Sequence, residues 1–197
     1  QEFALRFRIP GWAQDAPVPT DLYSFTDKAG AYSISVNGKK VNAKQYDGYA
    51  TISRTWKAGD VVEISLPMDV RRIKANDNVE DDRGKLAIER GPIMFCLEGK
   101  DQADSTVFNK FIPDATPMEA AYDANLLNGV VVLTGNAKEV DKDGSVKEVP
   151  FKAIPYSTWN NRGNAEMAVW IPASAAYAKP TPGYTLLSKK MLPKQPL

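Results

Sequence analysis

The sequence contains no histidine and only one cysteine, Cys96. The lack of histidine excludes Ser-His and Cys-His nucleophile systems within this chain, and it excludes metals held by imidazole. A single cysteine excludes an internal disulfide and a cysteine-rich zinc site. We therefore expect no cofactor in this chain. Carboxylate chemistry, ligand binding without catalysis and structural support remain as functions.

Excess charge and long apolar runs are also missing. Lys and Arg number 25 against 24 Asp and Glu, a net charge of +1, so the composition predicts neither a nucleic-acid partner nor an acidic membrane surface. No apolar run approaches the roughly 20 residues that cross a bilayer, and no secretory signal opens the chain. Because the first residue is Gln1 and a strand pattern follows at once, we expect an excised or processed fragment. The compartment stays open, with periplasm or secretion favoured for the parent protein.

Alternation with a period of two dominates the sequence, and helical periodicity is nowhere sustained. Apolar residues alternate with polar ones from Phe3 to Ile9, a pattern that indicates a strand with one buried face. The "VNGK" sequence predicts a hairpin, because Asn37 and Gly38 tolerate the positive φ angles of a type I′ turn. A second hairpin is predicted with Asp143-Gly144 at its tip, and "EMAVWIP" is predicted to be the last strand. Short strands separated by Gly, Pro and Asn turns predict an all-β fold.

The predicted organisation is two tandem antiparallel β-sandwich domains, jelly-roll-like, with no internal repeat. The polar cluster "NDNVEDDRG" at residues 76–84 is interpreted as a solvated linker in preference to a Ca²⁺ site, because its spacing fits no known calcium loop. This interpretation places the first domain at 1–82 and the second at 83–197. The second domain includes a long irregular insertion and a tail after Pro172 that contains prolines and lysines.

The stretch "FKAIPYSTWNNRGNAEMAVWIP" contains the candidate functional residues Tyr156, Trp159, Asn160 and Arg162. Aromatic rings could stack on a sugar while the amide and the guanidinium bind its hydroxyl groups. The alternative is that Trp159 packs against a neighbouring domain and Arg162 forms a structural salt bridge. The loop is therefore a candidate for sugar binding or for docking on a larger protein.

Other groups favour structural roles. Trp56 and Trp12 are expected to close the open end of the first sandwich. Glu89 and Glu98 could serve as the two carboxylates of a glycosidase, but nothing in the sequence selects that pair. Cys96 lies in an apolar strand, which favours a small buried side chain over a reactive thiolate.

Six strings together resemble the C-terminal region of the bacterial β-L-arabinofuranosidase family, glycoside hydrolase family 127 and its relatives. In chain order they are "FALRFRIPGW", "VNGK", "GYATISRTWKAGDVVEISLPM", "VRRIKAN", "GKLAIERGPIMFCLEG" and "FKAIPYSTWNNRGNAEMAVWIP". The resemblance covers the chain from Phe3 to about Pro172. It is weak between Asp101 and Glu119 and in the tail.

The resemblance implies an N-terminal (α/α) barrel that hydrolyses L-arabinofuranosides of plant-type glycans, with a zinc-bound cysteine as nucleophile. Zinc is accordingly expected only in the barrel, and no catalytic role transfers to Cys96. The implied role of this chain is non-catalytic: it supports the barrel, shapes one side of the cleft and offers a homodimer contact. An exposed apolar patch is expected where the barrel would dock. An independent carbohydrate-binding module that uses the Tyr156–Arg162 loop is the alternative.

Overall fold

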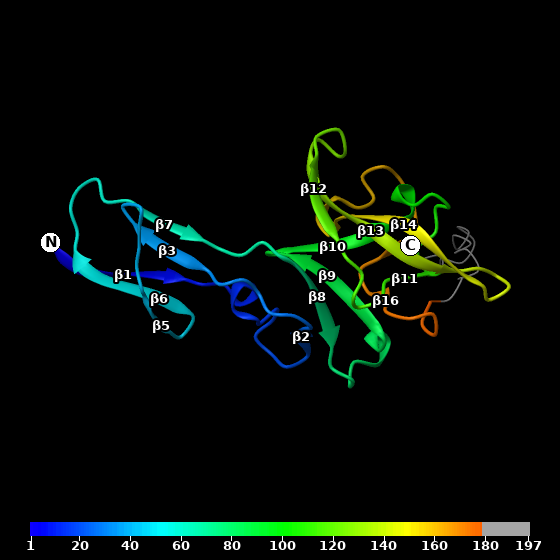
Figure 1. Ribbon diagram of the computed structural model, residues 1–197, viewed down its shortest axis with the longest axis horizontal. Helices are drawn as coiled ribbons and strands as arrows, with labels where there is room; N and C mark the ends of the chain where they lie inside the picture. Colours follow the sequence, from blue (N-terminus) through cyan, green and yellow to red (C-terminus); the bar gives the residue numbers. More distant parts are fainter. Residues whose placement is uncertain (179–197) are drawn as a thin grey trace, which may run out of the picture.

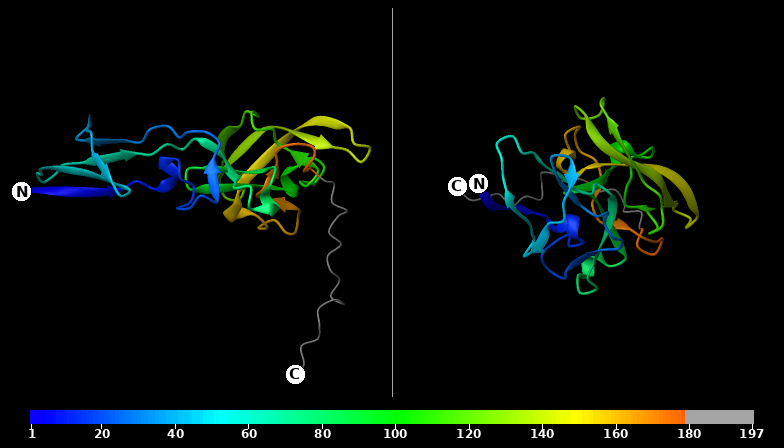
Figure 2. Two further views of the ribbon diagram at one scale, coloured as in Figure 1. Left: turned by 90° about the horizontal axis from the view of Figure 1, so that it is seen from below. Right: turned by 60° about the vertical axis from the view of Figure 1, so that its left-hand side comes forward.

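The computed structural model describes residues 1–178, and nearly all of its regular structure is β-strand. Two β units lie end to end in an elongated molecule, with the N-terminus at the far end of the first unit (Figures 1 and 2). Within the described residues the helical segments are short 3-10 turns: η1 (Gly11–Gln14), η2 (Glu80–Asp82), η3 (Gly99–Asp101) and η4 (Tyr156–Thr158). None of the helices among these residues has the length and apolar character needed to cross a membrane. The predicted all-β class is confirmed, whereas most of the predicted tail lies outside the described residues.

The first unit is a sandwich of two three-stranded antiparallel sheets. One sheet has the order β1 (Glu2–Arg8), β6 (Tyr49–Thr55), β5 (Lys44–Tyr46), and the other has the order β4 (Lys39–Lys40), β3 (Ser33–Val36), β7 (Val62–Ser65). Alternate residues of the central strands β3 and β6 are buried, as the period-two pattern predicts. Trp56 is buried at the edge of this core, and its indole N–H donates to the Phe3 carbonyl at 3.0 Å. The core of the first unit is thus closed by a tryptophan.

The predicted Asn-Gly hairpin joins β3 and β4. Asn37 and Gly38 have φ angles of 51° and 74°. A type I′ turn requires positive φ at both central positions, and these residue types tolerate it. The Asn37 side-chain oxygen also accepts a hydrogen bond from the Val61 N–H at 2.9 Å, which links this turn to the residue just before β7.

The second unit is one continuous antiparallel ladder that changes partners along its length. Its main path runs β11 (Lys110–Phe111), β13 (Val130–Val140), β14 (Val146–Pro155), β10 (Ile93–Glu98), β9 (Lys85–Arg90), β8 (Val70–Ala75), β2 (Tyr23–Phe25). Three further strands pair off this path: β12 (Glu119–Asp123) with β13, β15 (Met167–Ala168) with β10, and β16 (Ile171–Pro172) with β9. Because β13, β10 and β9 each pair with additional strands, the sheet curves and encloses an apolar core.

Strand β10 is covered on both faces. Phe95 and Leu97 pack into the main core of the second unit, while Cys96 packs on the other side with Val132 and Ile154. Successive residues of a strand point to opposite faces, so the consecutive apolar residues Phe95, Cys96 and Leu97 are buried on both sides of the sheet. The loop after β14 lies over the Cys96 side.

Two features differ from the sequence-based expectation. Residues 76–84 connect β8 to its neighbour β9 within one sheet, whereas the sequence-based interpretation makes them a linker between domains. β8 thus lies in the second unit's sheet, although the predicted division assigns it to the first domain. The predicted strand "EMAVWIP" is split, because Ala168 pairs with β10 and Ile171 pairs with β9. The division at residues 82/83 stays a prediction.

Candidate functional site

The candidate loop begins where β14 ends. The chain turns through η4 and returns to the sheet at β15. The rings of Tyr156 and Trp159 stack with centroids 6.5 Å apart and an interplanar angle of 22°. Trp159 packs against the apolar cluster around Cys96, whereas Tyr156 keeps 45% of its surface exposed. The outermost aromatic face of the loop therefore belongs to Tyr156, and Trp159 anchors it.

Arg162 is held by two acidic side chains on neighbouring elements. Its Nη1 and Nη2 atoms donate to the two oxygens of Asp101 at 2.8 and 2.5 Å, and Nη2 also donates to Glu98 Oε2. Glu98 is fully buried on β10, and the Asp101 side chain is 4% exposed at η3. The hydrogen bonds that Arg162 donates to Asp101 and to Glu98 raise its pKa above the usual value, against the opposing effect of burial. Both terminal nitrogens of the Arg162 guanidinium are thus hydrogen-bonded within the protein.

Two further hydrogen bonds fix the backbone of the same loop. The Asn160 N–H donates to Glu98 Oε1 at 3.1 Å, and Asn160 has a φ of 63°. Asparagine adopts this left-handed conformation more readily than most residues. The Asn161 side-chain N–H donates to the Thr158 carbonyl at 2.9 Å. Glu98 is the common acceptor that orients both Asn160 and Arg162.

The structure brings the four predicted loop residues together in one loop, and two of them bind the same buried carboxylate, Glu98. Tyr156 and Trp159 form the aromatic side of the loop, and Asn160 and Arg162 lie at Glu98. Asp101, the bidentate partner of Arg162, was missed by the sequence analysis. A cue was present, since "LEGKD" places a second acid shortly after Glu98. Whether the loop binds sugar or docks on a larger protein stays a prediction.

The carboxylates considered as a glycosidase pair occupy different surroundings. Glu89 pairs across the ladder with Met94 and with Arg71, whereas Glu98 lies at the other end of β10 opposite Met167. Burial raises the pKa of Glu89 to about 7, against the attraction of Arg71. Glu98 is already paired with Arg162.

The described residues do not fit a zinc site. They contain no group of three or more His, Cys, Asp or Glu side chains arranged to hold a metal ion. Cys96 is fully buried, and burial, followed by the charges of Glu98 and Asp101, raises the pKa of its thiol to about 12. A zinc ligand must be a thiolate, so this environment works against metal binding.

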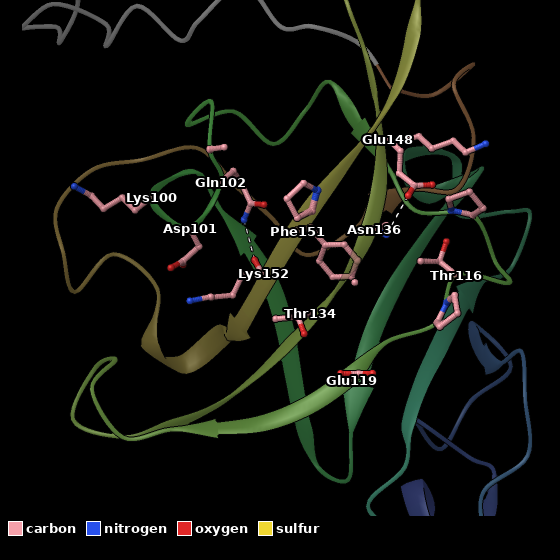
Figure 3. A pocket seen from close by; sticks show the side chains of 16 residues that line it. Lys100, Asp101, Gln102, Thr116, Glu119, Thr134, Asn136, Glu148, Phe151 and Lys152 are labelled. Carbon is pink, nitrogen blue, oxygen red and sulfur yellow. Dashed lines mark hydrogen bonds between the residues drawn. The ribbon is translucent and has the colours of Figure 1, made fainter.

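An open cleft of about 880 Å³ lies beside the loop (Figure 3). Strands β13 and β14 line it together with η3, and its charged side chains are of both signs, including Lys152 and Glu148. Gln102 donates to the Lys152 carbonyl at 2.8 Å, and its Oε1 atom has no partner among the described residues. The aromatic side chain of the cleft, Phe151, is buried in the core. The cleft therefore offers no free ring on which a sugar could stack.

Comparison with known proteins gives one consistent result. Residues 1–68 match the model of the beta-L-arabinofuranosidase GH127 middle domain, and residues 70–172 match the model of the glycoside hydrolase family 127 C-terminal domain. A non-reducing end beta-L-arabinofuranosidase from Bifidobacterium longum subsp. longum is 30% identical over 83% of this chain. The match covers 25% of that protein.

Solved structures agree with the family models. A GH127 beta-arabinofuranosidase is 38% identical over 91% of this chain, with a TM-score of 0.84, and the match covers 29% of that structure. A GH127 beta-L-arabinofuranosidase from Geobacillus stearothermophilus T6 is 38% identical over 87% of this chain, with a TM-score of 0.75 and 26% of that structure covered. The chain thus spans little more than a quarter of the length of these relatives. On this chain the match to the middle-domain model ends at residue 68, and the match to the C-terminal-domain model begins at residue 70, where β8 starts.

Proposed function

Because the chain belongs to glycoside hydrolase family 127, whose middle and C-terminal domains it spans, we propose that it is the non-catalytic support of an arabinofuranosidase-like hydrolase. In this proposal the parent's N-terminal (α/α) barrel, with its zinc, hydrolyses L-arabinofuranosides of plant-type glycans. The observation that carries the proposal is the tandem match of the two accessory-domain models over residues 1–172. The relatives are beta-L-arabinofuranosidases of which this region is a minor part.

We assign barrel docking to the Tyr156–Arg162 loop. Arg162 is occupied by Glu98 and Asp101, so its guanidinium is not free for sugar hydroxyls. The same contacts hold the loop in one conformation, which lowers the entropy cost of forming an interface. Tyr156 presents an exposed ring that a partner surface can bury. The proposal includes an apolar patch at which the barrel docks and a contact between two copies of the protein.

Substitution of Tyr156 separates docking from a role in folding. In the parent protein with its barrel, Tyr156→Ala should lower the melting temperature, because the ring loses its partner surface. In the isolated chain, the exposed ring should make little difference. Tyr122→Ala is the matched control, because Tyr122 is a 69% exposed tyrosine on β12. Equal effects of Tyr156→Ala in both proteins would contradict docking.

The non-catalytic assignment has a direct test. The isolated chain is incubated with an aryl β-L-arabinofuranoside, and release of the aryl group is followed by absorbance. We expect no turnover above the uncatalysed rate. Turnover that persists after repeated purification would overturn the assignment.

Sugar binding by the loop is the second candidate, and the stacked Tyr156–Trp159 pair is the observation in its favour. Arabinan fragments would be titrated into the chain while tryptophan fluorescence is recorded. A saturable change that Tyr156→Ala abolishes would support sugar binding. A change that survives this substitution would reject the loop as the site.

A further inference from the structure

The sheet β1-β6-β5 belongs to the first unit (Figure 1), and basic and aromatic residues gather on its solvent-facing side near the strand ends that lead toward η1. Residues directly opposite each other in an antiparallel sheet point to the same side. Two adjacent rows across the three strands therefore share this face. The rows are Arg8, Tyr49, Tyr46 and Arg6, Thr51, Lys44.

The opposite side of the same strands is the core side. Phe7 pairs with Ala50 and Leu5 pairs with Ile52, and all four pack in the core of the first unit. The register that buries these residues fixes the six residues of the two rows on the solvent side, since a slip of one position would exchange the faces. The basic and aromatic face is thus held by the sandwich itself.

The cations of this face are exposed and unpaired. Arg6, Arg8 and Lys44 are all exposed, and residues 1–178 provide none of them with an ion-pair partner. The Arg6 guanidinium lies 4.8 Å from the centroid of the Tyr49 ring, a contact that orients it over the sheet. Tyr46 is 78% exposed. The nearby acidic residues are Asp47 in the β5–β6 turn and Glu2 at the far end of β1, so the three cations leave the two rows locally positive.

We propose that this face binds a polysaccharide that carries carboxylate groups, such as a chain of uronic acids. Guanidinium and ammonium groups bind carboxylates through charge-assisted hydrogen bonds. An exposed tyrosine offers an apolar ring face together with a hydroxyl group, which suits a sugar ring. Residues on one face of a strand repeat at about 6.6–6.8 Å, and neighbouring strands lie about 4.7–4.9 Å apart. The groups therefore form an open two-dimensional array that suits an extended polymer.

A buried protein partner fits this face less well. The centre of a protein interface is apolar and depleted of charge overall, although arginine and tyrosine are common there, whereas the two rows contain three cations and no aliphatic side chain. Burying these cations would require a matched carboxylate for each one, because unpaired buried charges are strongly unfavourable. An acidic glycan can pair with the cations and leave them partly hydrated. The proposal concerns the first unit and is independent of barrel docking by the Tyr156–Arg162 loop.

The test compares three polysaccharides by affinity electrophoresis of the chain: polygalacturonate, highly methyl-esterified pectin and neutral arabinan. We expect polygalacturonate to retard the protein most and the retardation to disappear near 1 M salt, where the Debye length is about 3 Å. The variant Arg6→Gln/Arg8→Gln/Lys44→Gln should lose at least tenfold in affinity. The matched control is Lys39→Gln/Lys40→Gln/Lys142→Gln, which removes the same charge from exposed positions elsewhere and should retain binding.

Further outcomes decide against the proposal. Equal loss in the two triple variants would show attraction to net charge alone, and equal binding of the esterified and free polymers would show that carboxylates are not recognised. Tyr46→Ala alters one highly exposed ring, so it should fold normally and weaken binding about 2- to 10-fold. Unchanged binding in Tyr46→Ala would remove the aromatic part of the proposal. A lower melting temperature of the face variant in the parent protein, but not in the isolated chain, would assign this face to the barrel.

Discussion

Replacing Arg162 by alanine tests whether its ion pairs stabilise the second unit. The substitution removes the bidentate contact with Asp101 and leaves the fully buried Glu98 without its cation. Removing one partner of a buried ion pair costs about 3–5 kcal/mol. The Arg162 side chain is 26% exposed, so water screens part of the interaction, and Glu98 keeps the Asn160 N–H. We therefore expect a loss of about 2–3 kcal/mol in the free energy of unfolding.

Urea unfolding followed by tryptophan fluorescence measures this loss. Arg162→Lys keeps the positive charge but not the planar fork, so it should recover only part of the stability. The double variant Glu98→Gln/Arg162→Ala removes the buried charge as well as its partner, and should lose less than the sum of the single variants. A loss below about 0.5 kcal/mol for Arg162→Ala at pH 8 would refute the reasoning, since that is the range of surface substitutions.

Three further predictions concern other parts of the chain. Lys110→Met removes the ammonium group that lies between the carboxylates of Asp104 and Glu139. Because the Lys110 side chain is 1% exposed, this change should lower the free energy of unfolding in urea by about 3 kcal/mol. The control Lys142→Met changes an exposed lysine and should have little effect. Burial raises the folded-state pKa of Glu89 to about 7, so the stability that its protonation contributes below about pH 4.3 is lost as the pH rises through 7. The calorimetric melting temperature of the native chain should thus fall between pH 5 and pH 8 relative to that of Glu89→Gln, and parallel curves would contradict this. Gly135→Ala would place a methyl group 2.6 Å from the Pro117 carbonyl oxygen and should cost about 1–3 kcal/mol in urea melts.

Local features of the fold could be predicted because their causes are local. The turn at Asn37-Gly38 follows from the positive φ angles that these two residue types tolerate. The strand from Phe3 to Ile9 follows from alternation, which identifies the buried face without knowledge of the partner strand. In the candidate loop, the aromatic and amide groups were visible in the sequence, and so was the option of a structural salt bridge for Arg162.

Long-range pairing could not be predicted in the same way. The strand at Tyr23–Phe25 was missed, because its three residues show no alternation long enough to recognise, and its partner β8 lies far along the chain. The polar segment at residues 76–84 looks the same whether it joins two domains or two strands of one sheet. Asp101 lies in a stretch with little local pattern, and only the folded ladder brings it to Arg162.

The side chain of Arg71 connects the two units. It belongs to β8 in the second sheet, yet it donates to the Trp12 carbonyl at 3.1 Å and to Asp15 Oδ1 at 2.7 Å in the first 30 residues. The same guanidinium donates to Asp27 Oδ1 at 3.2 Å and lies 3.4 Å from the centroid of the Phe25 ring. Arg71 is 4% exposed, whereas the Asp15 and Asp27 side chains are 47% and 42% exposed, so the guanidinium is buried and its two carboxylate partners lie at the surface. Since one buried cation binds both the segment after β1 and the sheet of the second unit, bending between the units would break several of its contacts at once.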